Sequence, residues 1–202
     1  MSAMTKNVRL LKKIKDIQKI PNAKLVFQDE VHFNVQTDIS AVWAVKGSAP
    51  KIKSKPGKEK ISYSGFVIPS TGELFTDKPD TFTFETTISS IRSFLSAYPL
   101  EAGEKYYLVM DNASWHKKAK RLIKENTNGA YSDIKAQIVF VYLPPYSPDL
   151  NPIEQVWRIT RRDAKNNKYF SDKGELEGTI DSYYEVLAEP NETLQRLCSF
   201  RF

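Results

Sequence analysis

The sequence has 202 residues, 41% of them hydrophobic, which is enough to bury the core of a single domain. Its formal net charge of +6 and its pI of about 9.2 are compatible with an anionic partner such as nucleic acid. One cysteine excludes an intramolecular disulfide. Without a long apolar run or a signal-peptide core, the sequence predicts a cytoplasmic protein with no membrane span.

Residues 4–20 are expected to form a solvated basic helix that leads into the domain. Apolar side chains recur there at three-residue spacing, and lysines and arginines occupy many of the positions between them. Pro21 and Asn22 then break the helical pattern. We therefore expect a basic helical lead-in at 1–21, a main domain at 22–170 and a helical extension of that domain at 171–202.

The first predicted strand, Lys24–Glu30, ends in two consecutive carboxylates, Asp29 and Glu30. Side chains alternate across a strand, so only one of this pair can face a given site. Residues 31–36 are predicted to form a returning strand, and residues 41–45 to extend it.

Residues 46–60 read KGSAPKIKSKPGKEK and are predicted to form an exposed loop. Six lysines, two prolines and two glycines among fifteen residues are typical of such a loop. The loop is either a solubilising surface or a contact for the phosphate backbone of DNA. In the second case the candidate contacts are Lys51, Lys53, Lys55 and Lys58.

The middle of the chain alternates between strand-like and helix-like apolar patterns. We predict strands at 62–68 and 73–76, a helix at 84–98, a strand at 105–110, a helix at 117–124 and a polar loop at 125–135. Asp111 stands at the carboxyl end of the strand at 105–110.

The run Gln137–Leu143 is apolar and rich in β-branched and aromatic residues, as expected of a strand covered on both faces. A helix is predicted to begin with Asn151 as its N-cap, Pro152 in its first position and Glu154 in its first turn. Taken alone, this pattern is close to a capping box, in which Glu154 needs no further role.

The same helix is predicted to continue to about residue 168. Its exposed arginines either contact DNA phosphates or form a solvated helix face, and they are Arg158, Arg161 and Arg162. Two shorter helices are expected at 173–188 and 190–199.

Three carboxylates, Asp29, Asp111 and Glu154, follow the strands that are predicted to be buried. The carboxyl ends of strands in an α/β sheet converge at one edge, where sites form in such folds. Clustered carboxylates raise one another's pKa values unless a cation balances their charge. With two histidines and one cysteine, zinc is not expected, whereas an all-oxygen site suits Mg²⁺ or Mn²⁺. Such a site beside basic surfaces suits phosphoryl transfer assisted by two ions.

Three blocks of sequence resemble the signature motifs of DDE transposases. They are FQDE at 27–30, MDNASWH at 110–116 and LPPYSPDLNPIEQVW at 143–157, and they are most similar to the IS630 branch of the IS630/Tc1/mariner superfamily. The resemblance covers roughly residues 24–170. It implies an RNase H-like α/β fold, with a central mixed sheet flanked by helices. It also implies that Asp29, Asp111 and Glu154 are the catalytic triad that holds Mg²⁺, for which Mn²⁺ can substitute.

The sequence departs from that family in two respects. The helix-turn-helix region that reads transposon ends is not found in it, so the chain is either a separately encoded catalytic half or a truncated form. The interval between Asp111 and Glu154 is also longer than usual, and the loop at 125–135 accounts for the extra length. The expected partners are double-stranded DNA, a second copy of the chain and a separate helix-turn-helix protein, in association with the nucleoid.

Five further residues have weaker predicted roles. Asn112 either orients a metal ligand or phosphate, or forms a local turn. His116 is likewise expected to lie just behind the metal ligands, where it either contacts DNA near the scissile bond or is a hydrogen-bonded loop histidine. Trp157 is expected to pack on the sheet, and Glu30 and Asp149 are not expected to bind metal.

These observations leave three functions open. The favoured one is a Mg²⁺-dependent polynucleotidyl transferase that cleaves transposon ends with water and then joins the freed 3′-OH to target DNA. The second is another RNase H-like nuclease, or a domesticated transposase domain, that only hydrolyses DNA. The third is a basic DNA- or protein-binding module without activity. The intact triad argues against the third, because an inactive site would gain stability by losing three clustered charges.

Overall fold

The computed structural model describes residues 3–145 and 147–199. Residues 1–2 of the predicted lead-in, residues 200–202 of the predicted extension and Tyr146 of the third motif lie outside the described residues. The elements in chain order are α1 (Ala3–Ile17), β1 (Ala23–Asn34), β2 (Lys60–Ile68), β3 (Glu73–Asp77), α2 (Phe84–Ala97), β4 (Lys105–Met110), α3 (Ser114–Glu125), η1 (Thr127–Gly129), α4 (Ser132–Gln137), β5 (Ile138–Tyr142), η2 (Pro148–Leu150), α5 (Ile153–Thr160), the π-helical turn η3 (Arg161–Lys165), α6 (Lys173–Ala188) and α7 (Glu192–Cys198).

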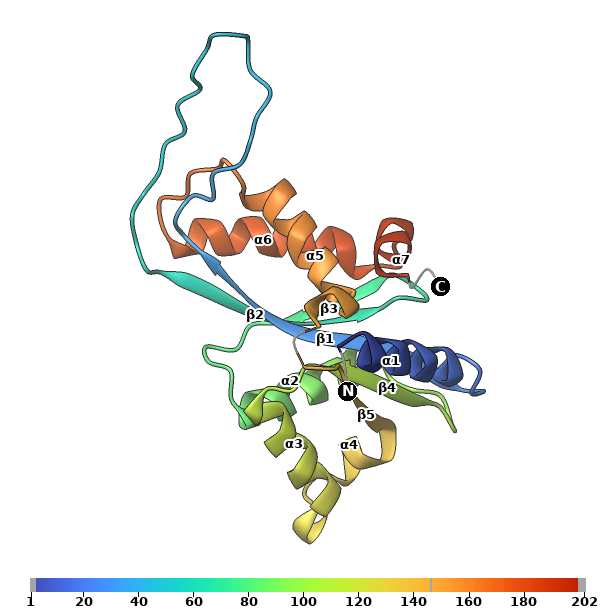
Figure 1. Cartoon of the computed structure of the whole chain (residues 1–202). Helices are drawn as coiled ribbons and strands as arrows, with labels where there is room; N and C mark the ends of the chain where they lie inside the picture. Colours follow the sequence, from blue (N-terminus) through green and yellow to red (C-terminus); the bar gives the residue numbers. More distant parts are fainter. Residues whose placement is uncertain (1–2, 146, 200–202) are drawn as a thin grey trace.

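The five strands form one mixed sheet in the order β3-β2-β1-β4-β5 (Figure 1). β1, β4 and β5 run parallel, whereas β2 is antiparallel to both of its neighbours. β1 pairs with β4 as far as Phe27 and Val109, and β4 pairs with β5 as far as Met110 and Tyr142. The carboxyl ends of the three parallel strands therefore meet at one edge of the sheet.

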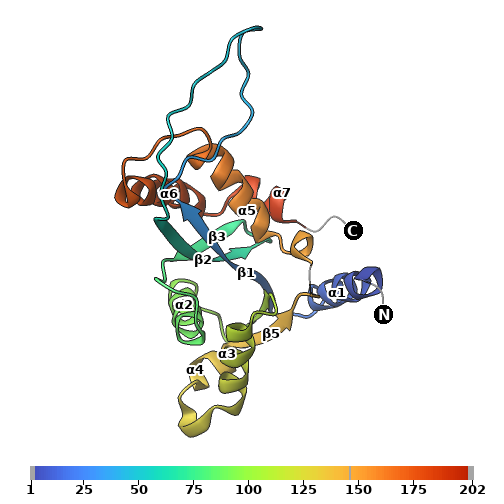
Figure 2. The same ribbon diagram turned by 60° about the vertical axis from the view of Figure 1, so that its left-hand side comes forward.

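Helices cover both faces of this sheet. The helices α1, α5, α6 and α7 share one hydrophobic core, and α2, α3 and α4 share a second core on the opposite face (Figures 1 and 2). Burial on both faces explains why the strands predicted at 105–110 and 137–143 are continuously apolar. Among the described helices, none combines the length and the apolar character needed to cross a bilayer.

The first helix is basic, as predicted, but it is not simply a solvated lead-in. Leu10, Ile14 and Ile17 are buried in the first core, while Val8 and Ile20 are exposed. The buried side chains follow the four-residue and three-residue spacing of a helix that lies on a sheet. α1 is therefore part of the packed structure.

The predicted returning strand at 31–36 is wrong, because β1 is one continuous strand of 12 residues. Val31 pairs with Tyr63, and Asn34 pairs with Lys60, so the strand carries its pairing with β2 past both carboxylates. Residues 41–45 form no strand. They lie in a long connection at 35–59, here called the arm, which extends away from the body (Figures 1 and 2).

Two boundaries in the middle of the chain also differ from the prediction. α3 begins at Ser114, before the predicted residue 117, so His116 lies in a helix. The segment 125–135 contains η1 and the start of α4, in which Ile134 is buried against the second core. Seven other predicted elements are confirmed within two residues as β2, β3, α2, β4, β5, α6 and α7. The helix predicted to continue to about residue 168 instead ends as α5 at Thr160 and is followed by the π-helical turn η3.

Candidate active site

The three carboxylates of the motifs line one cavity of about 520 Å³ at the carboxyl edge of the sheet. Asp29 lies in β1, Asp111 follows β4, and Glu154 lies in the first turn of α5. The remaining lining comes from Asn112, Ala113, Lys117, Leu143, Pro144, Pro145, Ser147 and Pro148. In their present side-chain positions, no three His, Cys, Asp or Glu residues of the described chain form a group that could hold one ion. The structure thus brings the three together at one cavity, and metal binding by them stays a prediction.

Asp29 is the most electrostatically strained of the three. Burial, together with the negative charges of Glu154 and Asp111, raises its pKa to about 7. The indole Nε1–H of Trp157 donates a hydrogen bond to Oδ2 of Asp29 over 3.3 Å, which favours the ionised form. Three hard carboxylates with excess negative charge are a donor set that fits Mg²⁺ or Mn²⁺.

A glycine opposite Asp29 makes room for the helix that carries Glu154. Gly65 of β2 is the registered partner of Asp29 in β1. A Cβ atom at Gly65 would overlap the indole of Trp157 and would lie 3.0 Å from Cδ1 of Ile153. Trp157 is 1% exposed, so the prediction that it packs on the sheet is confirmed. The close approach of indole and strand places the first turn of α5 beside Asp29.

The capping-box interpretation of the Glu154 motif is wrong. Pro152 precedes α5 as its N-cap, and no side chain caps this helix. Asn151 is buried, and its Nδ2 donates a hydrogen bond to the backbone oxygen of Gln28 over 3.3 Å. No hydrogen bond within the described residues involves the carboxylate of Glu154, which faces the cavity as a lining group. Asn151 therefore connects the motif to β1. The carboxylate of Glu154 takes no part in capping α5.

Residues at the start of α3 form hydrogen bonds with Asp111. Nδ1 of His116 lies 2.7 Å from Oδ1 of Asp111, and Nε2 of His116 lies 3.0 Å from Oε1 of Glu30. The burial of His116 lowers its pKa, but its hydrogen bonds to Asp111 and Glu30 outweigh that effect and raise it to about 9. The bond from His116 in turn lowers the pKa of Asp111. His116 is therefore a buried, hydrogen-bonded bridge between two carboxylates. The predicted hydrogen bonding is present, but His116 lies in α3 and not in a loop, and a DNA contact by it stays a prediction.

Asn112 joins two strand ends. Its Nδ2 donates a hydrogen bond to the backbone oxygen of Leu143, just beyond β5, and its side chain also lines the cavity. The local turn predicted for Asn112 belongs to its neighbour, because the Ala113 N–H donates to Oδ1 of Asp111 over 2.8 Å. Asp149, in η2, is not among the residues that line the cavity.

The predicted basic contacts lie outside the cavity. Arg158 and Arg162 are exposed, and the guanidinium of Arg161 lies over the ring of Phe33 at 5.3 Å. Lys165 is buried and pairs with Asp38 over 2.7 Å, so it does not belong to the solvated helix surface predicted for this segment. The four arm lysines do not line the cavity either, and they are Lys51, Lys53, Lys55 and Lys58.

Lys117 is the one lysine that lines this cavity within the described chain, and the sequence prediction did not single it out. It follows the MDNASWH motif directly, but it also opens a run of basic residues typical of a solvated helix. The start of α3 at Ser114 brings it to the cavity.

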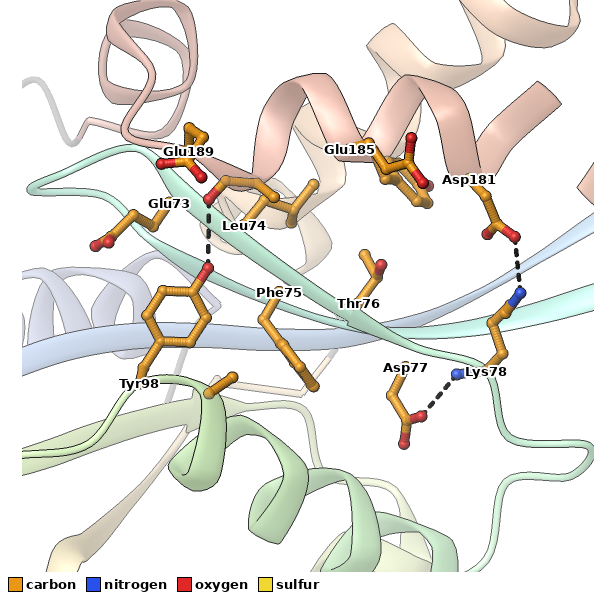
Figure 3. A pocket seen from close by; sticks show the side chains of 13 residues that line it. Glu73, Leu74, Phe75, Thr76, Asp77, Lys78, Tyr98, Asp181, Glu185 and Glu189 are labelled. Carbon is orange, nitrogen blue, oxygen red and sulfur yellow. Dashed lines mark hydrogen bonds and ion pairs between the residues drawn. The ribbon is translucent and has the colours of Figure 1, made fainter. Parts of the chain in front are cut away.

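A larger cavity, of about 670 Å³, lies elsewhere, between β3, α2 and α6 (Figure 3). Its walls carry five carboxylates, and Lys78 pairs there with Asp181 over 2.7 Å. The Tyr98 hydroxyl donates to the backbone oxygen of Ala188 at another point of the wall (Figure 3). None of the three motifs contributes to this cavity, so the candidate active site is the smaller one.

Residues 24–177 match the protein family described as DDE superfamily endonuclease. A 39 kDa protein of insertion element IS630 from Shigella sonnei is 21% identical over 164 residues, which are 80% of this chain and 45% of that protein. The uncharacterized protein y4pE/y4sA of Sinorhizobium fredii is 31% identical over 77 residues, 38% of this chain and 49% of that protein.

Among solved structures, a pre-cleavage Mos1 transpososome aligns with a TM-score of 0.66 at 15% identity, over 96% of this chain and 56% of that chain. The Mos1 strand transfer complex aligns with a TM-score of 0.61 at 19% identity, over 95% of this chain and 54% of that chain. The predicted RNase H-like fold is thereby confirmed.

The chain spans about half the length of the curated relatives and solved chains that it matches. The family match covers most of the chain and includes all three predicted motifs. The chain therefore belongs to the family of DDE superfamily endonucleases.

Proposed function

We propose that this chain is the catalytic domain of a DNA transposase, which cleaves transposon ends and joins them to target DNA. The observation that carries the proposal is the cavity at the carboxyl edge of the sheet, lined by Asp29, Asp111 and Glu154. Family membership supports a reaction at the DNA backbone. Mos1 transposase, which shares the fold, has been solved as a paired-end complex with its left transposon end.

The proposed reaction has two steps, and both involve the same transposon strand. In the first, the oxygen of water bonds to a backbone phosphorus, and the bond from phosphorus to the 3′ oxygen breaks. This leaves a 5′-phosphate and a 3′-OH, whose proton comes from the water. In the second, that 3′-OH attacks a phosphorus of target DNA. A new phosphodiester forms, and the displaced 3′ oxygen of the target leaves as a hydroxyl.

Asp29, Asp111 and Glu154 would hold Mg²⁺ or Mn²⁺, and we propose two ions. Bound ions would activate the attacking oxygen and stabilise the leaving oxygen. Mos1 paired-end complexes with Mg and with Mn support the choice of these cations. Trp157 and His116 hold Asp29 and Asp111 through hydrogen bonds, and Lys117 brings a positive charge to the cavity for a phosphate.

The proposed partners are double-stranded DNA at the transposon ends and at the target, and a second copy of the chain. Paired-end and strand transfer complexes of Mos1 support these partners. Recognition of the end sequence would come from a helix-turn-helix region, fused or separate. A protein with such partners would associate with the nucleoid.

The test compares wild-type protein with Asp29→Asn, Asp111→Asn and Glu154→Gln in the nicking of supercoiled plasmid, with Mg²⁺ and with Mn²⁺. Each substitution keeps the side-chain shape and removes a charge that holds a hard cation, so each should abolish nicking while the melting curve stays cooperative. Nicking near the wild-type rate in Glu154→Gln would restrict that residue to a structural role.

The second candidate function is hydrolysis alone, which needs the three carboxylates of the cavity but no joining of two DNA molecules. A joining assay separates it from transposition. Labelled oligonucleotides with free 3′-OH ends should become covalently attached to plasmid when they carry the transposon end. Nicking without attachment under these conditions would support the hydrolytic alternative. Absence of both reactions would support a binding module without activity.

A further inference from the structure

Adjacent residues of β1 send carboxylates to opposite sides of the sheet. Asp29 faces α5, where it accepts the hydrogen bond from Trp157. Glu30 faces α3, where it meets Trp115 and His116. This alternation is the ordinary geometry of a strand. Glu30 is therefore a fourth acidic residue near the proposed catalytic cavity, on the other side of the sheet, and it does not line the cavity itself.

Glu30 holds the first turn of α3 through two consecutive residues. Its two oxygens accept hydrogen bonds from Nε1 of Trp115 over 3.3 and 3.1 Å, and Oε1 also lies 3.0 Å from Nε2 of His116. The side chain of Glu30 is 9% exposed and that of His116 is 1% exposed. α3 has Ala113 as its N-cap and no capping side chain. The contacts with Glu30 therefore anchor a helix start that lacks its own cap.

The bridge reaches only one oxygen of Asp111. Oδ1 lies 2.7 Å from Nδ1 of His116 and accepts the Ala113 N–H over 2.8 Å. Within the described residues, no hydrogen bond ends on Oδ2. The side chain of Asp111 is 52% exposed, although its support is buried. One oxygen is committed to the fold, and the other remains for whatever occupies the cavity.

We propose that Glu30 is a positioning residue for the active site, and that it acts through His116 to orient Asp111 so that Oδ2 is presented to the metal ion. The proposal rests on the proposed function. Without Glu30, nothing in the described structure fixes the far nitrogen of His116, and the imidazole can rotate away from Asp111. Partners behind metal ligands orient them in this way, and their loss typically weakens metal affinity or activity about 10–100-fold.

The experiment measures Mn²⁺ affinity of the full chain by the electron paramagnetic resonance signal of the free ion. We expect Glu30→Ala to weaken binding about 10–100-fold. Glu30→Gln keeps one oxygen acceptor, so its loss should be smaller but at least several-fold. The matched control is Glu73→Gln, in a strand carboxylate that accepts a bond from Thr71 and lies outside the candidate site. The control should stay within about twofold of wild type.

A double-substitution cycle tests the route through His116. If Glu30 acts through the imidazole, Glu30→Ala should add little to the loss caused by His116→Ala, whereas independent roles would give additive losses. Additive losses would overturn the proposal. So would a wild-type affinity in Glu30→Gln, which decides the matter if Glu30→Ala fails to fold.

The outcomes also separate this proposal from the proposed function. Mn²⁺ binding that is lost in Asp111→Asn but unchanged in both Glu30 variants would overturn the positioning role alone. Failure of the wild-type chain to bind Mn²⁺ and to nick DNA would overturn both. Lower thermal stability of the Glu30 variants at an unchanged Mn²⁺ affinity would reduce Glu30 to a structural anchor of α3.

Discussion

Asp29 shows how a single residue can oppose the stability of the fold. Its pKa is raised to about 7, first by burial and then by the charges of Glu154 and Asp111. An aspartate in the unfolded chain titrates near its ordinary value of 3.8. Between these two pKa values the folded state binds a proton that the unfolded state has released, so stability falls as the pH rises from about 4 to about 7.

We predict that Asp29→Asn stabilises the metal-free protein at pH 8. The amide keeps the shape of the side chain and carries no charge, so it escapes the cost of burying a carboxylate among two others. The gain should be at least about 1 kcal/mol, or roughly 2–4 °C in Tm for a chain of this size. The measurement is thermal unfolding in EDTA at pH 5 and pH 8.

The difference between variant and wild type should be smaller at pH 5 than at pH 8. Adding Mg²⁺ should stabilise the wild type and leave Asp29→Asn unchanged, because only the wild type retains the proposed ligand. A variant that is less stable than the wild type at pH 8 without metal would contradict this account of Asp29.

At the level of residues, the sequence motifs predict which three carboxylates share one cavity, but not what holds them. The bridge from Glu30 through His116 to Asp111 depends on where α3 begins, and the basic run after the motif hides that boundary. The N-cap predicted at Asn151 is wrong for a related reason. The position of Asn151 suits an N-cap, but its side-chain amide donates a hydrogen bond to the backbone oxygen of Gln28 in β1. No local sequence pattern reveals that tertiary contact.

Among the elements, the position of α5 depends on a glycine in β2. Gly65 stands opposite Asp29, and the indole of Trp157 occupies the space above it. Because Trp157 and Glu154 are three residues apart, they lie on neighbouring turns of one helix face. The contact between Gly65 and Trp157 therefore sets both the support of Asp29 and the placement of Glu154.

We predict that Gly65→Ala lowers stability by about 1–3 kcal/mol, the usual cost of overpacking a core. The new methyl group has no room against Trp157 and Ile153, so α5 must shift. The measurement is urea unfolding followed by tryptophan fluorescence. Plasmid nicking by the folded fraction should also fall, because the shift moves Glu154.

Gly178→Ala is the matched control for this variant. Gly178 lies inside α6, and a Cβ atom added there would meet no neighbouring group within 4 Å, so alanine should raise stability by up to about 1 kcal/mol. If Gly65→Ala and Gly178→Ala unfold at the same urea concentration, the proposed contact with Trp157 does not limit the position of α5.

Apolar patterns predict most of the secondary-structure elements. A buried strand has a continuous run of apolar residues, and an amphipathic helix has apolar residues at periodic spacing. The prediction of a returning strand at 31–36 is wrong because β1 changes its environment partway along. Val31 and Phe33 are buried while His32 and Asn34 are exposed, so a doubly covered strand becomes a half-covered one without a turn.

For the whole molecule, the arm is the part that departs most from a compact α/β unit (Figure 1). Its root is fixed to the segment after α5. The buried Lys165 pairs with Asp38 and donates to the backbone oxygen of Gln36, and Asn167 exchanges hydrogen bonds with Ser40. Because η3 directly continues α5, these contacts connect the arm to the helix that carries Glu154.

The four arm lysines are not equivalent in the structure. Lys51, Lys53 and Lys58 are exposed, and the ammonium of Lys53 lies 4.2 Å from the ring centroid of Tyr169. Lys55 instead donates a hydrogen bond to the backbone oxygen of Ser171 over 2.6 Å. The sequence left two alternatives for the arm, a DNA contact and a solubilising loop. They now concern mainly the three exposed lysines, because Lys55 is held by its hydrogen bond to Ser171.

We predict that the exposed arm lysines bind DNA phosphates without reading sequence. Phosphate contacts release counterions, so the logarithm of affinity should fall linearly with the logarithm of salt concentration. Replacing Lys51, Lys53 and Lys58 with alanine should flatten that slope by up to about 0.9 for each contact removed, whereas Lys55→Ala should change it less. The measurement is fluorescence anisotropy of a transposon-end duplex and a scrambled duplex over a range of salt concentrations.

The control for this charge change is the triple alanine variant of Lys19, Lys105 and Lys135. These exposed residues stand near the opposite edge of the sheet, where the parallel strands begin, so their loss should leave the slope nearly unchanged. Equal flattening in both triple variants would mean that net charge alone drives binding, and the arm would then be a solubilising surface. A strong preference for the transposon end over the scrambled duplex would show that this chain reads bases, since phosphate contacts alone cannot produce that preference.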